Sequence, residues 1–339
     1  MNTYSVNRPY ATAGTINFAL RMVIGWTYFS AFWRRVILVD KLDPELAGYI
    51  GEKFNHFLPN ALGIKPLIEH LLINPKHLHY AMVSFTVMEA ITGLFLIFGL
   101  FTRLMSISVI GLALGILLGS GWIGTTCLDE WQIGILGIAG GFALLLSGSG
   151  LYSVDSWLIN RGYKFTHSRW FRNFASGDFQ MSEKAFKRLT FFGGMAILAL
   201  TLYTNQYFHG GLWGTLHNKS VKPIVKIESA FVEHDRLKFS VYRTEGADVY
   251  GSFLIGIEVT DSNGSTVLYL NGEALSMLNQ SLIQNKYVAK VRPGKHSLII
   301  PLGAKATISI PLQKQLGEGD YLLTLIDISG ATWKRSLSI

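Results

Sequence analysis

The sequence contains little cysteine and little charge. Cys127 is the only cysteine in 339 residues, and 15% of the residues are charged, against about 25% in ordinary soluble domains. One cysteine excludes an intramolecular disulfide, a CxxC redox pair, a CxxCH haem site and a four-thiolate zinc or iron–sulfur site. No flavin motif or metal-ligand pattern is visible either. The net charge of +8 predicts no nucleic-acid partner, because the location of charge matters more than its size.

Long hydrophobic runs are abundant. Hydrophobic residues make up 49% of the chain, and a membrane-spanning helix needs about 20 mainly apolar residues. Five windows of about that length are 15–33, 80–101, 104–123, 131–150 and 189–208. The first window lacks a small-residue cleavage site, so it is interpreted as a retained span and not as a signal peptide.

Basic residues predict how these spans are oriented. Seven lie between the fourth and fifth windows: Arg161, Lys164, Arg169, Arg172, Lys184, Lys187 and Arg188. Short cytoplasmic loops carry an excess of Lys and Arg. The pattern therefore predicts a multi-pass protein of the cytoplasmic (inner) membrane, with a cytoplasmic N-terminus. The 34–79 loop, in which short amphipathic helices are expected, and the C-terminal domain then lie outside the cytoplasm.

After the fifth window the hydrophobic pattern changes from long apolar runs to short alternating ones. Residues 220–339 contain short β-branched or alternating runs such as LKFSVYRT and FLIGIEVT, separated by turn residues as in DSNGS and GEGD. About eight such strands predict an all-β sandwich. The stretch GEALSMLNQSLIQN is the exception and is expected to form a helix or a covering loop. The predicted fold class is thus an α-helical membrane bundle of about five transmembrane helices, followed by an extracytoplasmic β-sandwich.

Three ionisable residues fall inside or at the ends of the apolar windows. Arg21 and Glu89 lie within the first and second windows, and Arg103 closes the second. A charge at mid-membrane is costly unless it is paired or faces water. Two interpretations stay open for Glu89: a structural ion pair with Arg21, or a carboxylate that exchanges protons near a bound quinone. Arg103 is expected to be an anchor at the inner face, and glycines are expected to pack the third window against the fourth.

The stretch GWIGTTCLDEW gathers Cys127 with Asp129 and Glu130, and Trp122 and Trp131 bracket it. It is either a short loop between two membrane helices or a site of chemistry. The two acids disfavour a thiolate and repel an anion, so a cation must offset them. Arg34 and Arg35, at the outer end of the first window, are the candidates. The two tryptophans are expected at the membrane interface as belt anchors.

Several segments resemble one family. The segment GSGWIGTTCLDEWQIGILGIAGGFALLLSGSGLYSVDSWL is similar to the membrane subunit of thiosulfate:quinone oxidoreductase, the DoxD family, and MEAITGLFLIFGLFTRL resembles the wider DoxX group. PGKHSLIIPLGAKATISIPL and GDYLLTLID are similar to the small subunit DoxA. The resemblance implies a DoxD-like four-helix domain over 1–188 with an outer loop at 34–79, a fifth transmembrane helix at 189–208 and a DoxA-like domain over 220–339. In the family's described enzyme the two parts are separate polypeptides.

The resemblance implies oxidation of thiosulfate to tetrathionate, with electrons passing to a membrane quinone. One cysteine is compatible with this reaction, because sulfur exchange can proceed at a single thiolate. The predicted catalytic residues are Cys127, Asp129, Glu130 and Glu89; the predicted substrate-binding residues are Arg34, Arg35, Arg21, Trp122 and Trp131. Membrane lipid, quinone, a small sulfur anion and a second copy of the chain are the expected partners. Two alternatives stay open: a non-catalytic DoxX-type scaffold whose β-domain binds a partner protein, and a carrier for small sulfur anions.

Overall fold

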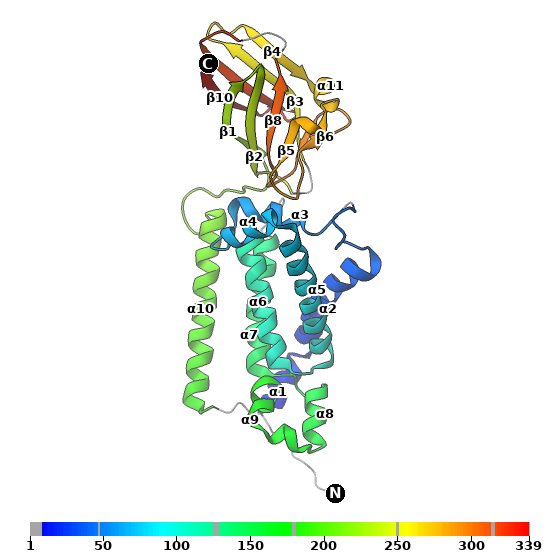
Figure 1. Cartoon of the computed structure of the whole chain (residues 1–339). Coiled ribbons are helices and arrows are strands. Elements are labelled where there is room, and N and C mark those ends of the chain that lie inside the picture. The colour runs from blue at the N-terminus through cyan, green and yellow to red at the C-terminus, as the bar shows by residue number, and fades with distance from the viewer. Residues whose placement is uncertain are drawn as a thin grey trace. The chain divides into compact units, whose positions relative to one another are not determined.

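The computed structural model describes residues 9–46, 48–124, 129–177, 181–248, 251–312 and 316–338. The chain divides into two compact units. The first unit comprises Met1–Ile50, His79–Gly121 and Asp129–Leu216, and the second comprises Gly51–Leu78, Trp122–Leu128 and His217–Ile339. Figure 1 shows that the first unit is made of helices and that most of the second is made of strands.

Long apolar helices dominate the first unit. Within the described parts of the chain, four helices are long and apolar enough to cross a membrane. They are α5 (Pro75–Phe98), α6 (Thr102–Ser120), α7 (Asp129–Ser147) and α10 (Glu183–His209). They match the second to fifth predicted windows, and they indicate a membrane protein.

The first predicted window differs from a single spanning helix. It contains α1 (Pro9–Ile16), α2 (Phe18–Phe32) and the π-helix η1 (Trp33–Leu38). The chain leaves helical geometry at Asn17, where φ is −83° and ψ is 11°, and Asn commonly interrupts helices in this way. With 15 residues, α2 alone rises about 22 Å, less than the ~30 Å of a bilayer core. Four of the five predicted windows thus contain one long apolar helix each, and in the first window α2 continues into η1.

Small residues bring α6 and α7 together. A Cβ added at Gly134 would lie 2.8 Å from the Leu117 side chain, and one at Gly141 would lie 3.1 Å from the Ser106 carbonyl oxygen. Such close backbone approach is the expected use of glycine in membrane helices. By contrast, Gly111 and Gly115 have no atom near an added Cβ, so the packing predicted for these two glycines is wrong.

Short helices follow α7: α8 (Val154–Asn160), η3 (Lys164–His167) and α9 (Arg169–Phe174). From α8, the fully buried Asp155 accepts hydrogen bonds from the backbone N–H of Phe101 at 2.9 Å and of Thr102 at 3.1 Å. Its carboxylate thus caps the N-terminus of α6, where unpaired N–H groups favour an anion. Burial nevertheless raises the pKa of Asp155 above its ordinary value.

Nearby, the buried guanidinium of Arg103 donates to the carbonyl oxygens of Leu145, Arg172 and Gly177. These bonds tie the start of α6 to the end of α7, to α9 and to the segment after α9. Arg103 is therefore a structural tie between backbone segments.

The second unit contains two antiparallel sheets. The first sheet has the order β1-β2-β8-β5, and the second has the order β10-β9-β3-β7-β6, with β4 also paired to β3. The strands are β1 (Ile224–Glu233), β2 (Arg236–Glu245), β3 (Ser252–Asp261), β4 (Thr266–Asn271), β5 (Ile283–Asn285), β6 (Arg292–Pro293), β7 (Leu298–Ile300), β8 (Lys305–Pro311), β9 (Asp320–Asp327) and β10 (Thr332–Ser338). The predicted all-β fold is confirmed.

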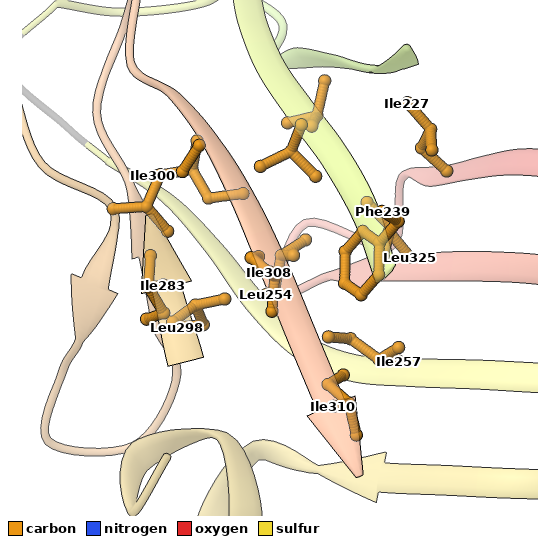
Figure 2. Close-up of a cluster of buried hydrophobic side chains, with 14 of the residues drawn as sticks. Ile227, Phe239, Leu254, Ile257, Ile283, Leu298, Ile300, Ile308, Ile310 and Leu325 are labelled. Atoms are coloured by element: carbon orange, nitrogen blue, oxygen red, sulfur yellow. The ribbon is translucent and has the colours of Figure 1, made fainter. Parts of the chain in front are cut away.

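The core of this domain lies between the two sheets. In Figure 2, Phe239 and Ile308 of the first sheet point toward Leu254, Ile257 and Leu325 of the second. All five side chains are fully buried. Leu254 and Ile257 are three residues apart on β3, and the irregularity in register between Leu254 and Gly256 lets both face the core.

The sequence predicted eight of these strands. The short strands β5 and β6 were not predicted. The stretch expected to be a helix or covering loop contains α11 (Gly272–Ser276) and η4 (Gln280–Leu282). The short helices expected within 34–79 are also present, as α3 (Glu52–Phe57), η2 (Leu58–Asn60) and α4 (Lys65–Ile73), and they belong to the second unit.

Candidate functional site

Glu89 and Arg35 form a buried ion pair in the helical unit. Arg35 Nη1 lies 2.6 Å from Glu89 Oε2 and also donates to Thr86 Oγ1 at 2.7 Å. The Glu89 side chain is 6% exposed and that of Arg35 is 12% exposed. Because a lone charge in hydrocarbon is costly, each of these groups requires the other to remain ionised inside the bundle.

The ion pair joins a regular helix to an irregular one. Glu89 lies near the middle of α5, whereas Arg35 lies in the π-helix η1 that continues α2. π-Helical turns are rare and occur frequently at functional sites. Within this turn, Arg34 is exposed and donates from Nε to the Ser30 carbonyl oxygen at 3.2 Å. The two adjacent arginines therefore have different environments, and of the two only Arg35 is bonded to Glu89.

Glu89 belongs to a polar stripe on α5. Thr86, Glu89 and Thr92 are all buried and are spaced three residues apart, which places them on one face of the helix. Thr92 Oγ1 lies 2.7 Å from Ser108 Oγ of α6. The buried Tyr28 of α2 belongs to the apolar cluster around Val109 and Leu144, and its hydroxyl lies 3.5 Å from the Val109 carbonyl oxygen. Buried polar side chains of α5 therefore lie next to an apolar cluster inside the bundle.

The predicted pair between Arg21 and Glu89 is wrong. Arg21 is buried and donates from Nη2 to the Tyr152 carbonyl oxygen at 2.6 Å. Its Cζ also lies 5.3 Å from the centre of the Phe18 ring. Arg21 therefore is not the ion-pair partner of Glu89, and its predicted role in substrate binding stays a prediction.

Two glycines set the register that separates Arg21 from Glu89. A Cβ at Gly25 of α2 would lie 3.0 Å from the Gly93 carbonyl oxygen, and one at Gly93 of α5 would lie 2.4 Å from the Phe29 backbone nitrogen. The two antiparallel helices cross at this point. Arg21 consequently lies beside Gly99, at the end of α5, while Glu89 lies on the other side of the crossing, toward η1.

The stretch around Cys127 is described only in part. Cys127 lies outside the described residues. Asp129 and Glu130 form the first turn of α7, where acidic side chains interact favourably with the helix dipole. Asp129 is exposed and Glu130 is half-buried. Both acids thus have a sufficient structural reason for their position, and their predicted catalytic role stays a prediction.

Of the two tryptophans, Trp122 differs from the predicted belt anchor. Trp122 is 1% exposed, and its indole Nε1 lies 3.3 Å from the Phe57 carbonyl oxygen within the second unit. Trp131 is half-buried in the first unit and donates to Thr204 Oγ1 of α10 at 2.9 Å. Trp122 is therefore buried in protein, and Trp131 ties α7 to α10.

Sequence reasoning found Glu89 and Arg35 separately and missed Thr86, Thr92 and Tyr28. The spacing of Thr86, Glu89 and Thr92 in an otherwise apolar helix was a usable signal. Tyr28 offered none, because its burial depends on how α2 packs. In the part of the chain that the structure describes, no group of three or more His, Cys, Asp or Glu side chains has the geometry of a metal site.

Comparison with known families identifies both halves of the chain. Residues 16–176 match the family described as TQO small subunit DoxD, where TQO is thiosulfate:quinone oxidoreductase. Residues 208–336 match the family described as TQO small subunit DoxA. The chain therefore carries a DoxD domain followed by a DoxA domain, in tandem in one polypeptide.

Proposed function

We propose that this chain is a thiosulfate:quinone oxidoreductase that oxidises thiosulfate to tetrathionate. The observation that carries the proposal is the tandem of DoxD and DoxA in one chain. Two thiosulfate ions, one quinone and two protons give one tetrathionate and one quinol, so atoms, charge and electrons balance. The quinone is a co-substrate, and the protein must bring it to the sulfur and supply protons.

The centre around Glu89 is the proposed quinone site. A quinone carbonyl oxygen needs a hydrogen-bond donor, and its ring needs apolar walls. Arg35 supplies a guanidinium, and Ile24 and Phe85 pack against the neighbouring apolar cluster. Because reduction consumes two protons, Glu89 is assigned to relay them from water to the quinone one at a time, while Arg35 neutralises its carboxylate between transfers.

Cys127 is proposed to carry the sulfur chemistry. Its thiolate forms a sulfur–sulfur bond to the outer sulfur of one thiosulfate, and the two electrons released pass to the quinone. The second thiosulfate attacks that outer sulfur, tetrathionate leaves, and the thiolate is restored. The exposed Arg34 is proposed to attract the thiosulfate dianion, and Asp129 and Glu130 to accept protons at the start of α7.

The test is quinone reduction by the purified chain in detergent, with thiosulfate as the only donor. We expect quinol formation at one per two thiosulfates consumed. Cys127→Ser should abolish it, because a hydroxyl is less acidic and forms no sulfur–sulfur adduct. Glu89→Gln should lower turnover about 100-fold while the protein still accumulates in the membrane.

Glu183→Gln is the matched control, since Glu183 is an exposed carboxylate paired with Lys187 on α10. Normal turnover by Cys127→Ser would exclude the thiolate mechanism. No thiosulfate-dependent quinone reduction by the intact chain would favour the scaffold instead. Protease added to spheroplasts tests the proposed topology, in which the β-domain lies outside the cytoplasm and is accessible to cleavage.

A further inference from the structure

Residues 51–78, here called the docking segment, lie inside the DoxD match but contact the β-domain of the DoxA match. Both belong to the second compact unit. We infer that the docking segment is a binding surface for a DoxA-type β-domain and holds that domain even when it is a separate polypeptide. The inference concerns assembly and does not depend on the proposed reaction.

Asn55 is the centre of this surface. It is fully buried, and both ends of its side-chain amide are bonded to the β-domain. Nδ2 donates to the Gly303 carbonyl oxygen at 3.1 Å, and Oδ1 accepts from the Ala289 backbone N–H at 3.0 Å. An amide that pairs with two separate backbone groups recognises a specific arrangement of chain, and losing it would leave both groups buried without a partner.

The shape of the β-domain at this point also fits the docking segment. Gly303 has a φ of +73°, and a Cβ added there would lie 1.8 Å from the Asn55 carbonyl oxygen. Any residue other than glycine would therefore force the two backbones apart. The main chains of Gly303 and Asn55 are in direct contact here. A side chain added at Gly303 would therefore overlap backbone atoms, which cannot move aside as a flexible side chain can.

Charged contacts surround Asn55. Lys53 Nζ lies 2.7 Å from Asp248 Oδ2, and His56 Nδ1 lies 3.8 Å from the same oxygen. His56 and Lys53 hold the pKa of Asp248 below its usual range. The positive charge of Lys53 on the docking segment thus faces the negative charge of Asp248 on the β-domain, so the two surfaces are complementary at this point.

A second charged contact has the opposite polarity. Glu69 of α4 accepts from Tyr287 Oη at 2.6 Å and from Lys286 Nζ at 3.1 Å. Tyr287 and then Lys286 hold the pKa of Glu69 below its usual value. Opposite polarities at two points fix the orientation of the β-domain on the segment.

Three further hydrogen bonds widen the surface. Asn60 Nδ2 donates to the Thr244 carbonyl oxygen at 3.0 Å. At Gly124, also within the DoxD match, the backbone N–H donates to Ser220 Oγ at 2.9 Å, and the carbonyl oxygen accepts from Asn218 Nδ2 at 2.5 Å. None of these contacts uses residues 210–216, which connect α10 to the β-domain. The contacts should therefore persist after that connection is cut.

The experiment cuts the connection in the intact protein. A protease site is placed within 210–216, the N-terminus carries an affinity tag, and the purified chain is cleaved in detergent. We expect the fragment that contains 217–339 to stay with the tagged fragment through size-exclusion chromatography at micromolar concentration. Release of the β-domain from the unmodified surface on cleavage would overturn the inference.

Variants show whether this surface is responsible. After cleavage, Asn55→Leu should release the β-domain roughly tenfold to hundredfold faster, because two backbone groups lose their partner. Lys238→Ala is the control, since Lys238 pairs with Glu233 inside the β-domain, and it should not change release. Release of Asn55→Leu at the rate of the unsubstituted protein would overturn the inference.

If Asn55→Leu fails to fold, exchanging the charges of Glu69 and Lys286 tests the same surface. Glu69→Lys should speed release roughly twofold to fivefold, as expected for an exposed pair. Adding Lys286→Glu to the same chain should restore slow release, because the pair is re-formed with its polarity exchanged. A double variant that dissociates as fast as or faster than Glu69→Lys alone would contradict the assigned contact.

Discussion

The helical unit and the β-domain bury polar groups to different extents. The core between the two sheets is built from aliphatic and aromatic side chains (Figure 2). The helical unit contains a smaller apolar cluster around Val109 and Leu144. Among the described residues it also buries Arg21, Glu89, Arg103, Asp155 and His209, whereas the β-domain buries Arg243 and Asp327.

The difference follows from the solvent that each fold requires. A β-sandwich in water is stabilised by removing apolar surface from that water. Apolar helices in lipid gain nothing comparable, so close packing and polar contacts between helices hold them together. A buried charge among such helices is either a tie, as Arg103 and Asp155 are, or a candidate for function, as Glu89 is.

The largest expected effect is on the apolar core of the β-domain. Phe239→Ala should lower the free energy of unfolding of that domain by about 4 kcal/mol, because the cavity adds to the lost burial. Urea-dependent proteolysis of the full chain measures it. Phe231→Ala is the control, since Phe231 is 44% exposed on the neighbouring strand. An equal response of the two variants would show that the core shown in Figure 2 is not what stabilises the domain.

The next effect is on the buried ion pair. Arg35→Met should destabilise the helical unit by about 3 kcal/mol, because Glu89 keeps a buried charge without its partner. Unfolding in mixed detergent micelles measures the change. Adding Glu89→Gln removes the stranded charge and should recover most of the loss. A double variant less stable than Arg35→Met alone would argue against a coupled pair.

A smaller effect is expected where α2 crosses α5. Gly93→Ala should cost about 2 kcal/mol, because the added methyl would overlap the Phe29 backbone. Gly111→Ala is matched to it, since the space beside Gly111 is open, and should leave stability unchanged. Thermal midpoints in detergent compare the two. Equal midpoints would show that the crossing of α2 and α5 lies elsewhere.

The smallest expected effect is the loss of stability of the second unit at acidic pH. Because His56 and Lys53 lower the pKa of Asp248 in the folded protein, its contribution is complete above the unfolded pKa of about 3.9. It is lost as the pH falls below that value. The thermal midpoint of the second unit should therefore decline between about pH 5 and pH 3, by an amount worth less than about 1 kcal/mol. Asp248→Asn should decline less over the same range, and an equal decline would assign the acid sensitivity to other carboxylates.

Sequence patterns were sufficient for the elements that depend on neighbouring residues alone. Apolar runs of spanning length predicted α5, α6, α7 and α10, and alternating runs predicted eight strands. Both signals are periodic along the chain, so they require no knowledge of distant contacts. The first window was the exception, because Asn17 and the π-helix interrupt a run whose composition alone satisfies a spanning helix.

Pairing between distant residues could not be predicted in the same way. Arg21 was suggested as the partner of Glu89 because both lie inside neighbouring predicted spans. The close crossing of α2 and α5 at Gly25 and Gly93 instead makes Arg35 the partner of Glu89. The prediction for residues 34–79 was similarly limited, since the short helices were expected while their contacts with the β-domain were not. Each of these contacts depends on a register between segments that local pattern does not encode.

The sequence by itself therefore determined the membrane-capable helices, the all-β domain and the presence of a carboxylate within the apolar bundle, because hydrophobic length and period are local properties. The tertiary structure decided which cation neutralises Glu89 and which segment of the DoxD half holds the β-domain. Both were decided by close backbone approach at a few glycines, Gly25, Gly93 and Gly303, since the position of closest contact sets which side chains come within bonding distance.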